Sequence, residues 1–266
     1  MRRTLADVRL VNAGMPLTSA QNPLLQSVRR AAKEGRPTDT GLIAIEGPHL
    51  IEEAASSPWR IEQVFVTSES RMRYQDLLRR LGVETTDVGT RAFASMAGTE
   101  NSQEILALIR PKRYRASDLF REPALVVVLD GIQDPGNAGA IVRSAEAFDA
   151  SGVAIANAGV RLANGKFLRA TAGSIFHLPY CERIEANELR HVRVFALAAN
   201  ARRSIQEADL RAPCALVVGN EGAGVSQDLL RIAEPVSIPA RRVESLNAAV
   251  ASSIALFEAQ RQRRNA

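Results

Sequence analysis

Residues 124–139 read Ala-Leu-Val-Val-Val-Leu-Asp-Gly-Ile-Gln-Asp-Pro-Gly-Asn-Ala-Gly. The first six are apolar and include three consecutive valines, which is typical of a central parallel strand buried on both faces. The Asp-Gly and Asp-Pro-Gly sequences that follow are composed of residues that favour turns, which predicts the end of the strand. From Asn137 to Phe148 the apolar spacing is helical, with one face formed by Ala138, Ile141, Val142, Ala145 and Phe148. The stretch therefore predicts an α/β fold built on a parallel sheet.

The rest of the C-terminal half repeats this alternation. Short apolar runs predict further strands at 153–156, 194–197 and 215–218. A last helix is predicted over Ser245–Arg261, with Leu246, Val250, Ile254 and Phe257 at helical spacing. This helix also holds many alanines, which allow another helix to approach closely.

The N-terminal half forms a second alternating block. Helices are predicted at Asn22–Lys33, Gly47–Ser56 and Met72–Leu81, and strands at Leu42–Ile45, Val64–Val66 and Ile105–Ile109. Residues 111–121 are polar and basic without periodicity, which indicates a linker. We therefore expect an N-terminal domain over residues 1–115 and a C-terminal domain over residues 116–266.

The composition, 46% hydrophobic and 24% charged, is that of a globular protein. No apolar run approaches the roughly 20 residues of a membrane span, and no hydrophobic segment follows the charged residues after Met1. We therefore expect no membrane contact, no secretory signal and a cytoplasmic location. Two cysteines cannot build a disulfide framework or a four-ligand zinc site, and the three histidines show no metal-ligand spacing, so no metal is expected.

The charge is unevenly distributed. Residues 1–121 hold 18 basic and 14 acidic residues, a net +4 of the total +5. Arginine suits phosphate, so this excess is consistent with an anionic partner. A solvated basic surface explains it equally well.

Three loops follow predicted strands at the end where α/β sheets bind ligands. The first, Asp130–Gly139, lacks the Gly-x-Gly-x-x-Gly pattern of dinucleotide-binding proteins, and Gly219–Ser226 lacks the Gly-Lys-Ser/Thr of a P-loop. Taken alone, each loop is explained by a tight turn, and Asp130 and Asp134 are better explained by turn chemistry than by a metal.

Taken together, the loops are far more specific. The segments are Asn137-x-Gly139-x-x-x-Arg143, Val218-Gly219-Asn220-Glu221-Gly222-x-Gly224, and Ile238-Pro239 followed by Glu244-Ser245-Leu246-Asn247. Their order and spacing resemble the signature motifs of the SpoU (TrmH-type) branch of the SPOUT RNA methyltransferases. Leu168–Ser174 also resembles a segment of this family. The N-terminal block resembles the substrate-binding domain that these enzymes often carry, best at Gly41–Ala54.

This resemblance carries expectations about fold and function. It implies a C-terminal SPOUT-type parallel sheet with a trefoil knot, a smaller N-terminal α/β/α RNA-binding domain, and a homodimer. It implies methyl transfer from S-adenosylmethionine to a ribose 2′-hydroxyl of RNA, and the separate substrate domain favours ribosomal RNA. The positions that match the family's catalytic residues are Asn137, Arg143, Glu221, Ser245 and Asn247. Those that match its cofactor-contacting residues are Gly219, Ile238 and Leu246.

The role of Arg143 needs a physical argument. A ribose hydroxyl is a very weak acid and must lose its proton during transfer, yet a guanidinium does not readily act as a base. We therefore expect Arg143 to clamp the phosphate beside the target ribose, with that phosphate or a water taking the proton. Without the other motifs, a helix salt bridge with Glu146 or Asp149 would explain Arg143.

Other readings remain open from the sequence. Asn137 and Ser245 both stand where a helix N-cap would explain them. A transfer-RNA 2′-O-methyltransferase and a non-catalytic RNA-binding paralogue are alternative functions, whereas the missing glycine fingerprint disfavours a metabolic dinucleotide enzyme. The segment Pro239–Arg242 departs from the family's usual residues beside the cofactor.

Overall fold

The computed structural model describes residues 15–264. The chain divides into two compact units. The first contains residues up to Lys112 together with Arg161–Leu168, and the second contains Arg113–Val160 and the residues from Arg169 onward. The expectation drawn from the residues after Met1 lies outside the described range. Between residues 15 and 264 no helix is long and apolar enough to cross a bilayer.

The first unit is built on a four-stranded sheet. Its strands lie in the order β1 (Ile43–Glu46), β4 (Ile105–Arg110), β2 (Arg60–Val66) and β3 (Glu84–Asp87). β4 is antiparallel to both neighbours, while β2 and β3 are parallel. The sequence did not indicate β3, because Glu-Thr-Thr-Asp has no apolar alternation and occupies a sheet edge.

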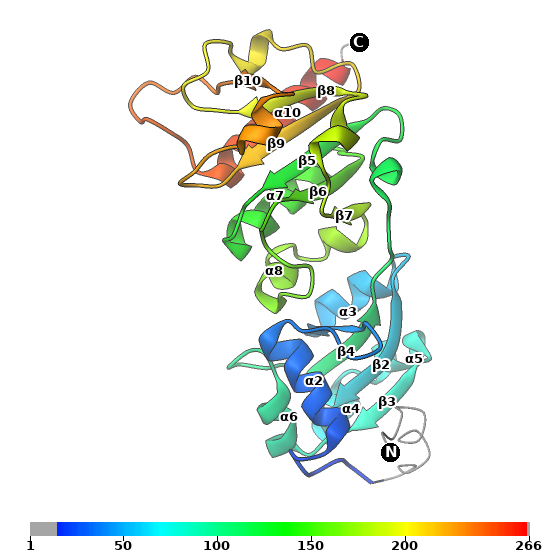
Figure 1. Ribbon diagram of the computed structural model, residues 1–266. Coiled ribbons are helices and arrows are strands. Elements are labelled where there is room, and N and C mark those ends of the chain that lie inside the picture. Colours follow the sequence, from blue (N-terminus) through cyan, green and yellow to red (C-terminus); the bar gives the residue numbers. More distant parts are fainter. Residues whose placement is uncertain (1–14, 265–266) are drawn as a thin grey trace. The chain divides into compact units, whose positions relative to one another are not determined.

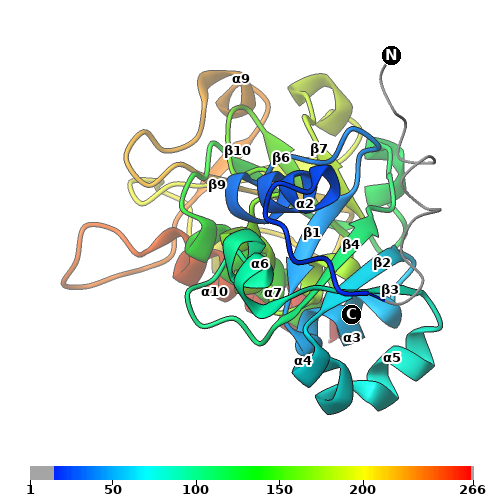
Figure 2. The same ribbon diagram turned by 90° about the horizontal axis from the view of Figure 1, so that it is seen from below.

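Helices cover both faces of this sheet. α2 (Pro23–Glu34) and α6 (Thr90–Met96) lie side by side (Figure 1 and Figure 2) and pack against the face that presents Phe65, Leu106 and Leu108. α3 (Pro48–Ala55) contacts β1, β2 and β4 and buries Leu50 and Ile51. The unit therefore has the α/β/α layering expected for the N-terminal domain.

The helix expected over Met72–Leu81 is instead two short ones. α4 (Ser68–Arg73) begins after Thr67, whose side chain accepts a hydrogen bond from the Ser70 amide. The helix stops at Tyr74 (φ −107°, ψ 21°), and α5 (Gln75–Leu81) begins there. The one-helix prediction was wrong because no glycine or proline marks the break.

The second unit contains six parallel strands. Their order is β10 (Glu234–Val236), β8 (Arg193–Leu197), β9 (Cys214–Gly219), β5 (Leu125–Asp130), β6 (Gly152–Ala156) and β7 (Tyr180–Glu182), and every adjacent pair is parallel. All six residues of β5 are buried. The valine-rich stretch is therefore the central strand that the sequence predicts.

Two helices on one side of this sheet run parallel to each other. They are α7 (Pro135–Ala147) and α10 (Ala248–Arg264), which pack together (Figure 1). Their contacts follow the same order along both helices. The Ser144 and Ser253 hydroxyl oxygens are 2.7 Å apart, and further along the rings of Phe148 and Phe257 meet edge to face with their centroids 5.9 Å apart. The opposite face is covered by α9 (Gln227–Leu230) and by the 3₁₀ helices η1 (Ala116–Leu119) and η3 (Ala186–Leu189).

The small residues of α10 allow this close packing. Ala249, Ala255 and Ala259 are buried, as expected for a helix that another helix approaches closely. By contrast, the larger residues of the apolar stripe point outward: Val250 is 48% exposed, Ile254 38% and Phe257 54%. The stripe read from the sequence is therefore a surface feature of the second unit.

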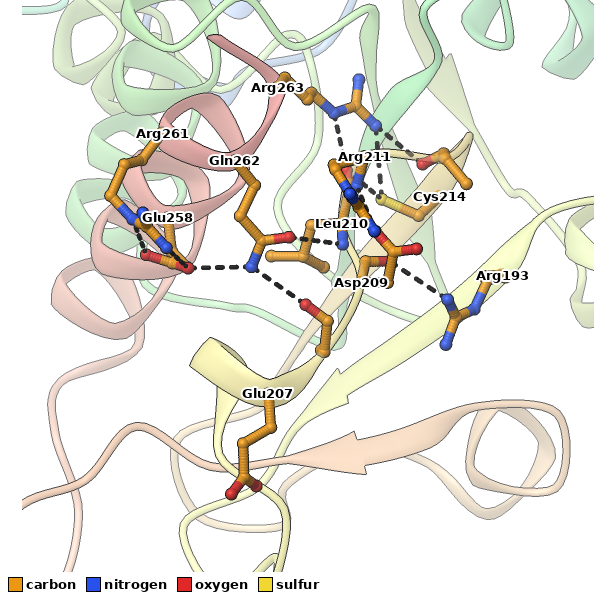
Figure 3. A network of polar contacts seen from close by, with 12 residues as sticks. Arg193, Glu207, Asp209, Leu210, Arg211, Cys214, Glu258, Arg261, Gln262 and Arg263 are labelled. Atoms are coloured by element: carbon orange, nitrogen blue, oxygen red, sulfur yellow. Dashed lines mark hydrogen bonds and ion pairs between the residues drawn. The ribbon is translucent and has the colours of Figure 1, made fainter. Parts of the chain in front are cut away.

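The last turn of α10 is anchored to the amino ends of two strands (Figure 3). The Arg263 guanidinium donates to the carbonyls of Leu210, Pro123, Ala124 and Ala212 at 2.8–3.1 Å, just before β9 and β5 begin. Gln262 accepts from the Leu210 amide and donates to the Ala208 carbonyl. One turn earlier, two hydrogen bonds from Arg261 hold the pKa of the Glu258 carboxyl below its usual value.

Candidate active site

The candidate site lies at the carboxyl ends of the central strands. Asp130 ends β5, and in the sheet it stands level with Ala156 on β6 and Gly219 on β9. Because all strands are parallel, the loops that leave these residues meet at one edge. The first two sequence motifs therefore begin from neighbouring strand ends.

A buried carboxylate holds these loops in place. Asp130 is only 2% exposed; its Oδ1 accepts from Asn157 Nδ2 at 2.5 Å and its Oδ2 accepts from the Ser226 amide at 2.6 Å. A buried carboxylate without partners is costly, so these bonds fix the segments after β6 and β9. Sequence reasoning assigned Asp130 to a turn and missed this role. The available signal was an aspartate placed directly after five buried apolar residues.

The loop after β9 folds back on itself. Asn220 exchanges two backbone hydrogen bonds with Gly224, and its side-chain oxygen accepts from the amides of Gly222 and Ala223 at 3.0 Å. A Cβ added to Gly219 would lie 2.3–2.5 Å from backbone atoms of Gly224 and Val225. Glycine is therefore required at 219 by the packing of this loop.

Three motif residues converge through side-chain hydrogen bonds. Asn137 Nδ2 donates to Glu221 Oε1 at 2.8 Å, and Asn247 Nδ2 donates to Asn137 Oδ1 at 3.0 Å. The amide of Asn137 is thus held on both sides, by residues 84 and 110 positions away. We call these three residues the Asn137 cluster.

Local capping makes this arrangement possible. Asp134, not Asn137, is the N-cap of α7, and its Oδ1 accepts from the Asn137 amide at 2.7 Å. The N-cap interpretation of Asn137 was wrong, and the side chain is available for the cluster. Likewise Asn247, not Ser245, precedes α10, and its Oδ1 accepts from the amides of Ala249 and Val250. Asparagine and aspartate are both strong N-caps, so the sequence alone could not choose among neighbouring candidates.

Arg143 is exposed on α7 and carries its charge uncompensated. Its side chain forms no hydrogen bond or ion pair with any residue between 15 and 264, so the expected alternative, a salt bridge with Glu146 or Asp149, is not formed. Arg143 lies six positions after Asn137, about 120° around the helix from it. Its guanidinium is therefore available to an external anion.

The remaining predicted residues lie in the segment between β10 and α10. Ile238 and Leu246 are half-buried, while Ser245 and the intervening residues 239–244 are exposed. Among the described residues, Ser245 has no hydrogen bond to the Asn137 cluster. The structure thus brings together Asn137, Glu221 and Asn247 but leaves Arg143 and Ser245 outside their hydrogen-bond network.

Close packing explains the glycine of the first motif. A Cβ on Gly139 would lie 2.3 Å from the Ala170 Cβ and 2.6 Å from its carbonyl carbon. Ala170 ends α8 (Gly165–Ala170) and belongs to the Leu168–Ser174 segment noted in the sequence. Gly139 therefore lets α7 approach that segment. No group of three or more histidine, cysteine or acidic side chains in the described part of the chain is placed to hold a metal.

Comparison with known protein families gives two matches. Residues 124–257 match the SpoU rRNA Methylase family, and residues 22–107 match the MRM3-like substrate binding domain. The first match contains every residue of the Asn137 cluster. The second covers β1, β2, β3 and the first half of β4 in the first unit.

Similar proteins agree with these matches. The chain is 31% identical over 248 residues to the 23S rRNA (guanosine(2553)-2′-O)-methyltransferase RlmP of Bacillus subtilis, covering 91% of this chain and 97% of RlmP. A crystal structure of an AdoMet-bound rRNA methyltransferase from Sinorhizobium meliloti superposes with a TM-score of 0.80 at 27% identity, covering 93% and 97% of the two chains. The SpoU methyltransferase AviRb from Streptomyces viridochromogenes, solved with AdoMet, gives a TM-score of 0.83 at 25% identity, covering 92% and 99%.

Proposed function

The chain belongs to the SpoU rRNA Methylase family, and from this premise we propose that it transfers a methyl group from S-adenosylmethionine to a ribose 2′-hydroxyl of ribosomal RNA. The observation that carries the proposal is the Asn137 cluster. Three motifs far apart in sequence place one residue each in a single hydrogen-bonded group at the carboxyl edge of a parallel sheet. Ligands of α/β sheets bind at this edge.

The residues at this edge fit S-adenosylmethionine. The backbone of Gly224 is exposed, and a Cβ there would meet nothing within 4 Å, so a ligand can approach the main chain of this loop closely. Ile238 and Leu246 add half-buried apolar surface, and with Gly219 they are the proposed cofactor contacts. The cofactor supplies an already electrophilic methyl group.

The protein's part is then to position the nucleophile and to accommodate charge. We assign the cluster residues Asn137, Glu221 and Asn247 to holding the target ribose, with Ser245 reaching the same place from its exposed loop. Arg143, without a partner on the described chain, binds the phosphate beside that ribose through its planar fork. The proton of the hydroxyl passes to this phosphate or to a water.

The first unit is assigned to substrate binding, within the proposed domains 1–115 and 116–266. α2 exposes Arg29, Arg30 and Lys33, none of which forms an ion pair with another described residue. Uncompensated arginine and lysine on one helix attract the RNA backbone. RlmP, which is similar over both units, is named for 23S rRNA, and this favours ribosomal over transfer RNA.

A homodimer completes the proposal. The stripe of Val250, Ile254 and Phe257 is an exposed apolar face on a helix whose other side is already packed. Such a face on a protein surface is typical of an interface. We assign it to a second copy of the chain and place the enzyme in the cytoplasm, where ribosomal RNA is assembled into ribosomes.

The decisive experiment is mass-spectrometric mapping of ribose methylation in ribosomal and transfer RNA from cells with and without the gene. One ribose methyl group missing from ribosomal RNA, and restored by the purified protein with S-adenosylmethionine, supports the proposal. Loss of a ribose methyl group from transfer RNA alone would show that transfer RNA, and not ribosomal RNA, is the substrate. Unchanged methylation in both would leave the non-catalytic RNA-binding paralogue as the better reading.

A further inference from the structure

A second recess lies at the carboxyl edge of the second unit's sheet, separate from the residues assigned so far. Its walls are the end of β6, the segment from Arg183 through η3 to Arg190, and α9 with Arg231 and Ile232. None of the eight site residues derived from the sequence motifs lines it. We call it the β6–α9 pocket.

The charge of this pocket is positive and incompletely paired. Three arginines line it, together with the acidic residues Glu185 and Asp228. Asp228 accepts from Arg231 at 2.8 Å, and Glu185 takes part in the capping box that begins η3. Arg183 and Arg190 are exposed, and neither guanidinium has a hydrogen bond or ion pair with any residue in the described range. Two guanidinium groups are therefore free to bind an anion.

The position of Arg183 is fixed by its neighbours. Its φ of 64° lies in the left-handed region, which a residue with a long side chain seldom adopts. The next residue, Ile184, is buried, and its amide donates to the Ile155 carbonyl on β6 at 2.9 Å. A strained backbone conformation held by a buried neighbour points to a function for the residue.

A hydrogen-bond network joins the pocket to the candidate active site. Asn157, which lines the pocket, donates through Nδ2 to Asp130 Oδ1 and to Ser226 Oγ. Ser226 stands at the start of α9, five residues after Glu221 of the Asn137 cluster. The pocket and the cluster thus share one set of loops on one edge of the sheet.

We infer that the β6–α9 pocket binds a backbone phosphate of the RNA substrate, at a nucleotide other than the one that is methylated. Guanidinium groups bind phosphate oxygens in pairs, and the side-chain amide of Asn187 adds a further donor at the same surface. Such a contact fixes the register of the RNA without reading its sequence. The inference rests on the proposed function, since it requires an RNA substrate.

The test is the double variant Arg183→Asn/Arg190→Gln. Asparagine is chosen because it adopts a left-handed φ more readily than most residues. The matched control is Arg211→Gln/Arg264→Gln, which removes two exposed arginines where α10 ends and β9 begins, at the opposite edge of the sheet. Binding of unmodified 23S rRNA transcript is measured by filter retention as a function of salt, and melting temperatures verify that both variants fold.

We expect the pocket variant to lose about tenfold in RNA affinity. The slope of the logarithm of its RNA-binding constant against the logarithm of the salt concentration should become shallower by about 1.4–1.8, as for the loss of two phosphate contacts. Its KM for RNA should rise with kcat nearly unchanged, and S-adenosylmethionine affinity by calorimetry should match the wild type. Affinity and slope equal to the control would overturn the inference. If the wild type binds RNA through this pocket yet never methylates it, the proposed function fails while the phosphate site stands.

Discussion

Ser144 and Ser253 lie 109 positions apart in sequence, yet their hydroxyl oxygens are 2.7 Å apart. They mark the middle of the contact between α7 and α10. Near the start of the same contact Asn247 bonds to Asn137, and at its end Phe257 meets Phe148. Two parallel helices in fixed register therefore deliver the first and third motifs to one place, and the geometry of the site depends on this register.

The polarity of the Asn137–Glu221 hydrogen bond gives the first prediction. Asn137→Asp removes the donor and places two carboxylates together, so methyl transfer should fall about tenfold or more because an unpaired group costs about 1–3 kcal/mol. Adding Glu221→Gln supplies a new donor and should restore part of the lost rate. Single-turnover methylation of the four variants in a double-mutant cycle measures the coupling. Strictly additive losses would show that this contact does not support catalysis.

Arg143 gives the second prediction. Arg143→Ala should lower kcat by about 100-fold, since it removes the group that binds the phosphate beside the nucleophile. Arg143→Lys should remain poor because an ammonium cannot reproduce the planar fork. Calorimetry should show unchanged S-adenosylmethionine binding in both. Near-normal turnover of the alanine variant would remove Arg143 from the site.

The third prediction concerns α2. Arg29→Gln/Arg30→Gln/Lys33→Gln should weaken RNA binding and lower the log–log salt slope by about 2–3, because three phosphate contacts are lost. The matched control is Arg73→Gln/Arg79→Gln/Arg80→Gln, which removes the same charge from arginines of the same unit that are already paired with carboxylates. Equal RNA binding by the two triple variants would argue against α2 as an RNA contact.

Gly219 gives the fourth prediction. A methyl group there meets the backbone of Gly224 and Val225, so Gly219→Ala should displace the loop and cost about 1–3 kcal/mol of stability, with cofactor affinity falling at the same time. Gly222→Ala is the control, since its Cβ would meet only Asn220 Oδ1, at 3.6 Å. Thermal melting and calorimetry on the same samples compare them. A Gly219→Ala protein of normal stability that still lost the cofactor would indicate direct contact instead of loop packing.

The fifth prediction concerns the exposed stripe of α10. Ile254→Asp should convert a dimer to a monomer in sedimentation velocity, because a carboxylate would be buried without a partner at the interface. Met72→Asp serves as control: Met72 is 74% exposed on the first unit and lies outside the stripe. A wild-type protein that sediments as a monomer at micromolar concentration would refute the assignment.

Sequence reasoning located the central elements because their signals are strong. The buried run before Asp130 and the apolar face of α7 both appear where expected. The edge strands β3, β7 and β10 were missed because each has only three or four residues and little alternation. Periodicity could not show that Tyr74 divides a helix, since nothing in its own chemistry requires a stop there.

The candidate site was predictable as a set of residues but not as a geometry. Motif spacing singled out Asn137, Glu221 and Asn247, whereas the bonds between them depend on helix register and strand order, which are long-range properties. The sequence also did not predict that the Ile254 side chain points away from the rest of the second unit. A stripe at helical spacing reveals an apolar face without showing what that face contacts. The knot implied by the family resemblance stays a prediction.

The anchoring of α10 has a consequence for the time at which the second unit can form during synthesis. The carbonyl of Ala124 receives its bond from Arg263, 139 positions later in the chain. While the ribosome is still translating the residues between them, the amino ends of β5 and β9 lack this clamp. The bonds that Arg263 makes to the carbonyls before β5 and β9 can therefore form only after the helix carrying Arg263 has left the exit tunnel, although the strands themselves are translated much earlier.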